Sequence, residues 1–209
     1  INAIFLDQIV VKASQRARAI DIYENLNRGG VCLNTFDLIM ARVAKVSKEN
    51  FSVRIHKLMM NQKNYPEKVL PDRMRIILSA NLRNRTYNAT ENTGCYNASN
   101  NDLNSKYVDI FLDVLSIYSY VPNLNPEDIK LDYIKKGSIL NLKPEQIDQN
   151  CEKTITAIDR AMFFLQTRCG IRTLQEVNYA LMVVLIAVVF IDDEYFYDKD
   201  VHDLLEGWY

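Results

Sequence analysis

The sequence has little of what small secreted domains and zinc modules use to hold themselves together. Its 209 residues include only two histidines and four cysteines, Cys32, Cys95, Cys151 and Cys169. No two cysteines form a CxxC pair, whereas zinc sites gather their ligands at such short spacings. A disulfide framework needs denser cysteine in a shorter chain. We therefore interpret the four thiols as reduced and structural.

The sequence also lacks an excess of charge and a long hydrophobic run. With a net charge of −1, no global field draws the chain onto nucleic acid or an anionic membrane, so a DNA contact would need a local basic patch. The longest apolar stretch, residues 179–191, has 13 residues. A membrane-spanning helix needs roughly 20. We interpret this stretch as a buried core helix and expect no membrane partner.

No secretory signal peptide is visible, although the chain opens on an apolar run at residues 1–11 and has no initiating methionine. We interpret this opening as the point where the true N-terminus has been removed, and we expect a cytoplasmic protein. Three Asn-X-Ser/Thr triplets, at residues 84–86, 88–90 and 97–99, keep a secreted glycoprotein open as an alternative. Such triplets arise by chance in an Asn-rich segment, and the scattered cysteines argue against secretion.

Helical periodicity dominates the second half of the chain. Helices are predicted at residues 106–120, 125–137 and 179–191. The second begins with Asn-Pro-Glu-Asp, a typical helix start, and the third is opened by a Thr-Leu-Gln-Glu capping box. The clearest helix is predicted at residues 144–170, between a proline and a glycine. Its apolar residues recur at helical spacing: Ile147, Cys151, Ile155, Ile158, Met162 and Leu165.

The first half predicts a helix, a loop and a trace of strand. Asn34 and Asp37 form a capping-box-like start, and the apolar face that follows is Phe36, Ile39, Met40 and Val43, with Ile55 and Leu58 further on. Residues 84–104 are Asn-rich with almost no large aliphatic side chain, which indicates a surface loop. The segment at residues 8–13 is short and rich in β-branched residues, as a strand would be. We predict a mainly α fold, a helical bundle with a short remnant of β-strand near the N-terminus.

One polar stretch, residues 23–33, has the chemistry of a ligand site. Its candidate residues are Glu24, Asn25, Asn27, Arg28, Gly29 and Gly30. Carboxylate and amide oxygens suit Mg²⁺, whereas an arginine and the N-terminus of the helix that follows suit phosphate. The alternative is an amphipathic helix that ends in a glycine cap and turns a solvated polar face outward. Spacing alone favours this alternative.

The same region carries a family resemblance. Residues 19–41, which read AIDIYENLNRGGVCLNTFDLIMA, resemble the signature of the GmrS-type domain: an aromatic residue and Glu, then Asn, Gly-Gly, Leu and a helix start with an acid. The segments 106–120, 139–144, 169–172 and 179–190 resemble the helical half of that family. The resemblance implies a ParB/sulfiredoxin-like nucleotide-binding fold followed by a helical bundle. It places the chain among GmrSD-type DNA restriction and phage-defence proteins, which hydrolyse nucleotide and cleave modified DNA.

The resemblance assigns roles to the polar stretch. Glu24 and Asn25 match a pair that helps to hold Mg²⁺-nucleotide in the related ParB fold, and Arg28 stands in the basic position. Asn27, Arg28 and Gly29-Gly30 would then face the nucleotide phosphates. The chain departs from ParB by the extra Gly29-Gly30. It also lacks the family's upstream Asp-Gly-Gln-Gln-Arg box and shows no HNH motif.

Because of these departures, we expect this chain to be only a part of such a protein. Residues 1–33 would be the C-terminal edge of the nucleotide-binding domain, and residues 34–209 the helical bundle. We expect Mg²⁺, a nucleoside triphosphate, DNA and an HNH nuclease domain or subunit as partners of the full-length protein. We expect no catalytic residue, cofactor or activity in the fragment alone. The alternative function is a helical protein-interaction or scaffold module without nucleotide chemistry.

Overall fold

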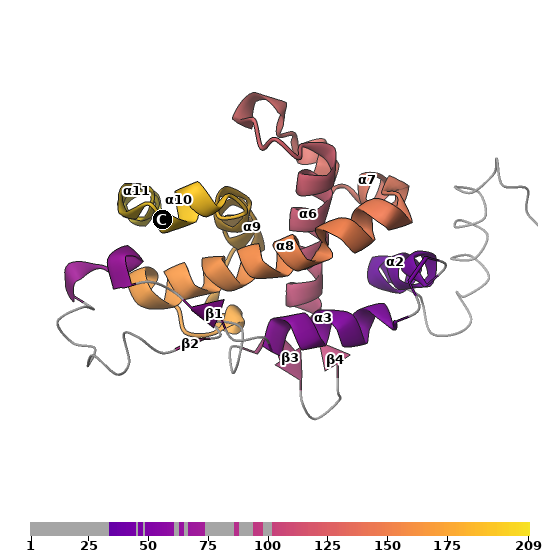
Figure 1. The fold of residues 1–209 in the computed structure, drawn as a ribbon, viewed down its shortest axis with the longest axis horizontal. Coiled ribbons are helices and arrows are strands. Elements are labelled where there is room, and N and C mark those ends of the chain that lie inside the picture. Colours follow the sequence, from indigo (N-terminus) through magenta and orange to yellow (C-terminus); the bar gives the residue numbers. More distant parts are fainter. Residues whose placement is uncertain are drawn as a thin grey trace, which may run out of the picture.

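The computed structural model describes residues 34–44, 46–47, 49–60, 63–64, 67–73, 86–87, 94–97 and 102–209, and over these residues the fold is mainly α. The predicted fold class is confirmed. The strand predicted at residues 8–13 lies outside the described residues. Figure 1 shows the elements.

The longer elements in chain order are α2 (Thr35–Val43), α3 (Phe51–Met60), α6 (Ser105–Tyr120), α7 (Lys136–Asn141), α8 (Pro144–Phe164), α9 (Ala180–Val189), α10 (Asp193–Tyr197) and α11 (Lys199–Trp208). Short 3₁₀ turns are η3 (Glu67–Val69), η4 (Pro126–Asp128), η5 (Leu131–Ile134) and η7 (Leu174–Glu176), and η6 (Leu165–Cys169) is a π-helical turn. Two antiparallel pairs of two-residue strands complete the fold: β1 (Lys63–Asn64) pairs with β2 (Thr86–Tyr87), and β3 (Tyr96–Asn97) pairs with β4 (Asp102–Leu103).

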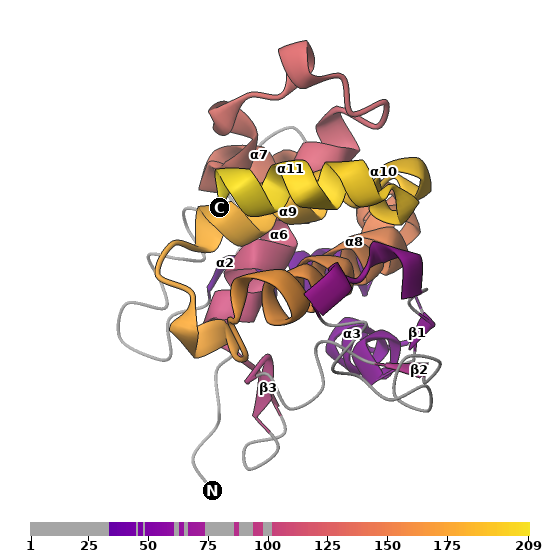
Figure 2. The same ribbon diagram turned by 90° about the vertical axis from the view of Figure 1, so that its left-hand side faces the viewer.

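Helix α8 lies at the centre of the bundle. Proline at its first helical position costs no hydrogen bond, and Gly170, at φ +72°, takes the left-handed conformation that ends the π-helical turn η6. Helices α2, α3, α6 and α9 all pack against it, and the views in Figures 1 and 2 place α9, α10 and α11 on the side of α8 opposite to α3. All core positions predicted for the helix at residues 144–170 are buried: Ile147, Cys151, Ile155, Ile158 and Met162 of α8, and Leu165 of η6.

Helix α9 is buried on one face only. Val183, Val184, Ile186, Ala187 and Val188 are buried, whereas Leu181 and Leu185, one turn apart, are exposed. The capping box predicted to open this helix is wrong. Residues 174–176 instead form the short turn η7, in which the Glu176 carboxylate accepts from the backbone N–H of Arg172 at 2.9 Å. The helix itself begins only at Ala180.

The helix predicted at residues 125–137 is wrong beyond its first turn. Asn125 does cap, accepting from the N–H of Glu127, but η4 ends at Asp128 and α7 continues through Gly137. The physical reason is in the pattern that follows the cap. Apolar residues alternate at positions 129, 131 and 133, a spacing of two that an α-helix cannot place on one face. The chain makes two short turns instead.

The apolar face predicted from Phe36 onward is divided between two helices. Phe36, Ile39 and Val43 of α2 are buried, and so is Ile55 of α3. The break falls where the Asn50 side chain accepts from the N–H of Val53 and thereby caps α3. A single periodic face therefore covers two consecutive helices rather than one.

The end of the Asn-rich segment is part of the core. Cys95 and Leu103 are buried among the core residues, and the ring of Tyr96 stacks on that of His56 at 3.9 Å between centroids. Gly94 has φ +77°, and a Cβ there would overlap the side-chain amide of Gln175. The prediction of a surface loop over residues 84–104 is therefore wrong for the β3–β4 hairpin.

The C-terminal helices pack on the bundle through buried polar groups as well as rings. His202 of α11 is fully buried against Phe164, Phe190 and Phe196. The Arg168 guanidinium, which is also buried, binds the carboxylates of Asp203 and Glu206 on α11. The aromatic residues of this C-terminal part pack on the bundle only in part, because Phe196 is buried whereas Trp208 is half exposed.

Candidate functional site

The site predicted from the sequence lies outside the described residues. This applies to each of its members: Glu24, Asn25, Asn27, Arg28, Gly29 and Gly30. Their assignment to Mg²⁺ and phosphate stays a prediction. Among the residues that the structure describes, no group of three or more His, Cys, Asp or Glu side chains is arranged to hold a metal ion. Within the same residues, no helix combines the length and the hydropathy needed to span a bilayer.

The described part of that stretch begins at the N-terminus of α2. As predicted, Asn34 and Asp37 form a capping box: the Asn34 side chain accepts from the N–H of Asp37, and the Asp37 carboxylate accepts from the N–H of Asn34, both at 2.9 Å. One N–H of the helix N-terminus is thus already bonded. The carboxylate beside it repels anions, so this N-terminus suits a phosphate less well than the sequence suggested.

The structure adds a polar cleft that the sequence did not indicate. It lies between the C-terminal turn of α6 with residues 122–124, the middle of α8, and residues 191–193 at the start of α10. Its volume is about 730 Å³, which is within the range of small-ligand sites. Its charged lining consists of Glu152, Lys153, Arg160, Asp192 and Asp193.

Arg160 is the most deeply placed charge of the cleft. Its guanidinium donates to the carbonyl oxygen of Phe190 at 2.8 Å and to the Asp193 carboxylate at 2.5 Å. Its central carbon lies 4.6 Å from the centroid of the Phe196 ring. The carbonyl and the ring fix the plane of the guanidinium.

Lys153 lies two turns before Arg160 on the same face of α8. Its ammonium donates to the hydroxyl oxygen of Tyr118 at 3.2 Å and lies 5.7 Å from the centroid of that ring. Because the hydroxyl lies outside the ring, these two distances place the ammonium beyond the hydroxyl, and the contact is a hydrogen bond rather than a cation–π contact. Thr156 lines the cleft between the two basic residues.

The acids of the cleft have different surroundings. Asp192 caps α10 by accepting from the N–H of Glu194 at 2.8 Å, and Asp193 binds Arg160. Glu152 is exposed at the rim. The cleft therefore offers donors on α8 and acceptors at its edge, an arrangement suited to binding a polar ligand.

Other titratable groups lie outside the cleft. Burial raises the pKa of Asp113 on α6 to about 7, and the carboxylate of Asp109, one turn earlier, adds to the shift. Burial also raises the pKa of the Cys151 thiol to about 12 and that of Cys169 to about 11, so these thiols are poor nucleophiles. His202 is buried among aromatic rings.

One pattern in the sequence could have indicated the cleft. Lys153, Thr156 and Arg160 lie three and four residues apart on the polar face of the most regular helix. That face alone is typical of a solvated helix, and only the fold shows that α6 and α10 cover it. Comparisons of the chain with models of known protein families, with curated protein sequences and with solved structures gave no match.

Proposed function

We propose that this chain is the helical part of a GmrSD-like, modification-dependent DNA restriction and phage-defence protein. In this proposal the full-length protein binds and hydrolyses nucleotide and acts on DNA. The observation that carries the proposal is the resemblance of residues 19–41 to the GmrS-type signature. The end of that signature is a leucine followed by a helix start with an acid, and here Leu33 is followed by the capping box of α2 with Asp37.

The position of α2 in the bundle supports the proposal. Ile39 and Val43 are fully buried, and the Arg42 guanidinium donates to the carbonyl oxygen of Leu140 in α7. The signature therefore ends inside an element of the core and not in a linker. Residues 24–30 precede α2 closely in the sequence, so in this proposal α2 couples nucleotide binding to the bundle.

Calorimetric titration of the full-length protein with Mg²⁺-nucleotide tests the proposal. Arg28→Ala should weaken binding by about 1.5–3 kcal/mol, the value of a hydrogen bond to a charged group. Lys57→Ala is the matched control, because Lys57 lies on the exposed face of α3 and pairs with Glu49. Unaltered affinity in a folded Arg28→Ala protein would reduce the motif to a capped helix end.

A helical interaction module is the second candidate, and exposed apolar side chains favour it. Leu204 and Trp208, one turn apart on α11, are 74% and 50% exposed. Leu181 and Leu185 form a similar pair on α9. Such pairs are anchors for a partner helix. Sedimentation of the wild type and of Leu204→Glu distinguishes the two functions, because an interaction module that self-associates through α11 would dissociate in the variant while nucleotide binding would be unchanged.

A further inference from the structure

The two side chains of the ion pair in the cleft differ in their exposure to solvent. The Arg160 side chain is 9% exposed, whereas the Asp193 side chain that binds it is 74% exposed. A carboxylate this accessible to water is already largely hydrated, so its own burial does not hold it at Arg160, whereas the buried guanidinium still needs an anionic or polar partner. Asp193 is thus a partner that another anion can replace.

Arg160 does not need Asp193 to keep its place. Its bond to the Phe190 carbonyl oxygen and its contact with the Phe196 ring involve the other edge and the face of the guanidinium. These contacts hold it in one orientation before any ligand arrives. A planar guanidinium fixed in this way matches the geometry of carboxylate and phosphate.

Further donors lie on the same helix face. The Lys153 ammonium has three N–H groups, and its hydrogen-bond acceptor within the described residues is the hydroxyl of Tyr118. Donors therefore remain for a ligand. Thr156, between Lys153 and Arg160 in the sequence, also lines the cleft.

The acids at the rim restrict the ligand. Glu152 and Asp192 would repel a highly charged anion, but their oxygens accept hydrogen bonds from hydroxyl or amino groups. The lining thus selects a small molecule that carries one acidic group beside several donors.

We propose that the cleft binds such a ligand, a small carboxylate or phosphate compound bearing hydroxyl or amino groups. Its oxyanion lies between Lys153 and Arg160, where it replaces Asp193. The carboxylate of Asp193 occupies the oxyanion position when the cleft is empty. This site is separate from residues 24–30 and does not depend on the nucleotide function proposed above.

Nuclear magnetic resonance titrations of the chain with inorganic phosphate and with acetate test the proposal. We expect saturable shifts of the Arg160 side-chain N–H and of the Thr156 amide with at least one of the two anions, and the stronger one identifies the acidic group. Lys153→Gln should raise the dissociation constant at least about fivefold, as expected when a charge-assisted hydrogen bond is lost. Asp193→Asn should lower it about fivefold, because the internal competitor is gone.

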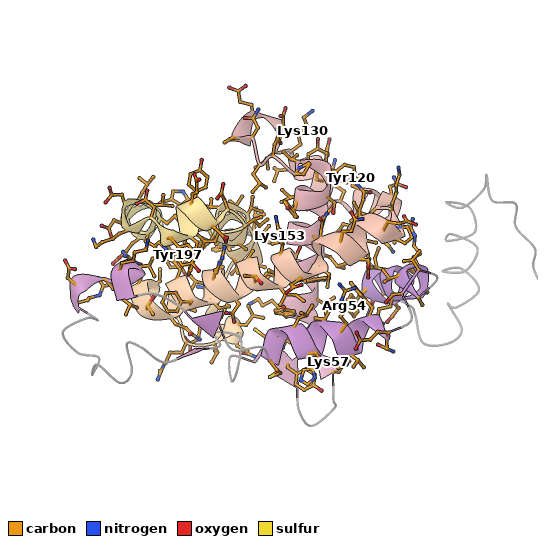
Figure 3. All side chains as sticks on the ribbon, in the orientation of Figure 1. Arg54, Lys57, Tyr120, Lys130, Lys153 and Tyr197 are labelled. Carbon is orange, nitrogen blue, oxygen red and sulfur yellow. The ribbon has the colours of Figure 1, made fainter. Side chains whose placement is uncertain are left out.

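Two control variants match these charge changes away from the cleft. Lys57→Gln removes a lysine on α3, and Figure 3 shows Lys57 and Lys153 on opposite sides of α8. Asp200→Asn removes an exposed carboxylate on α11. Shifts that do not saturate, or cleft variants that behave like their matched controls, would overturn the proposal. Arg28→Ala should leave the phosphate shifts unchanged, so failure of the nucleotide site and failure of this cleft are separable.

Discussion

His202 is a buried polar residue whose environment accepts only its neutral form. Nε2 lies 2.7 Å from the carbonyl oxygen of Phe196, so this nitrogen carries the hydrogen. Nδ1 is buried without a hydrogen-bond partner among the described residues. Burial lowers the pKa of His202 to about 4, the bond to Phe196 acts in the opposite direction, and the charges of Arg168 and of Asp203 and Asp198 act against each other.

This environment predicts that the fold loses stability in mild acid. In the unfolded chain the pKa of His202 is about 6.5, so below this pH the unfolded state binds a proton that the folded state does not. The contribution of His202 to the free energy of unfolding is therefore fully present above about pH 6.5, and it is lost as the pH falls toward 4. We expect a loss of about 2 kcal/mol between pH 7 and pH 5 from this residue. Urea unfolding at several pH values measures it.

His202→Phe provides the control. The phenyl ring is apolar and can pack against Phe190 as the imidazole does, while the titrating group is removed. We expect the variant to flatten the pH dependence between pH 7 and pH 5, even if its stability at pH 7 is lower. An equally steep dependence in the variant would assign the acid sensitivity to other groups.

At the scale of elements, α8 provides the test of the core. Ile158 is fully buried at its centre. Ile158→Ala should cost about 2–5 kcal/mol, through lost transfer free energy and the cavity that remains. The exposed Gln149→Ala on the same helix should change stability by less than about 0.5 kcal/mol. Chemical denaturation of both variants gives the comparison, and a cost below about 0.5 kcal/mol for Ile158→Ala would mean that α8 is not central.

Because of the β3–β4 hairpin, the Asn-rich segment contributes to the stability of the fold. If residues 84–104 were only a surface loop, replacing them by a short linker would cost less than about 1 kcal/mol, because long surface loops add little closure entropy. The replacement would also remove Leu103 and Cys95 from the core. Truncating a buried leucine alone costs about 2–5 kcal/mol, so we now expect this replacement to destabilise the fold by at least that amount.

The sequence predicts an element correctly where its local signals agree. In α8 the apolar period, the proline start and the glycine end all agree, and the helix is found where predicted. After Asn125 a good cap is followed by apolar residues at a spacing of two, and the cap alone does not extend a helix. The cleft depends on α6 and α10 meeting one face of α8, a tertiary arrangement that no local pattern in residues 149–160 encodes.

At the scale of the whole molecule, the buried Arg168 and the exposed Arg73 join segments that are distant in the sequence. Arg168 donates to the carbonyl oxygen of Val69 as well as to the acids of α11, and Arg73 donates to the carbonyl oxygen of Arg168 and pairs with Glu206. The end of α8, the segment around η3 and the C-terminal helix are therefore fixed at one place. The cleft lies further along α8, at Lys153 and Arg160, so its variants can be tested without breaking this network.

The central position of α8 has a consequence for synthesis on the ribosome. Helices α2 and α3 bury Phe36, Ile39 and Ile55 in a core that α8 completes, and α8 ends only at Phe164. About a hundred residues separate α3 from that end, and translation at about 5–20 residues per second takes on the order of 5–20 s to add them. During this interval the apolar faces of α2 and α3 lack α8, and the ring contacts that can form are those of Phe36 with Phe51 and of Phe51 with Phe111 on α6. Nascent chains that stop before α8 should therefore be substrates for ribosome-associated chaperones, and chains that extend past it should be released from them.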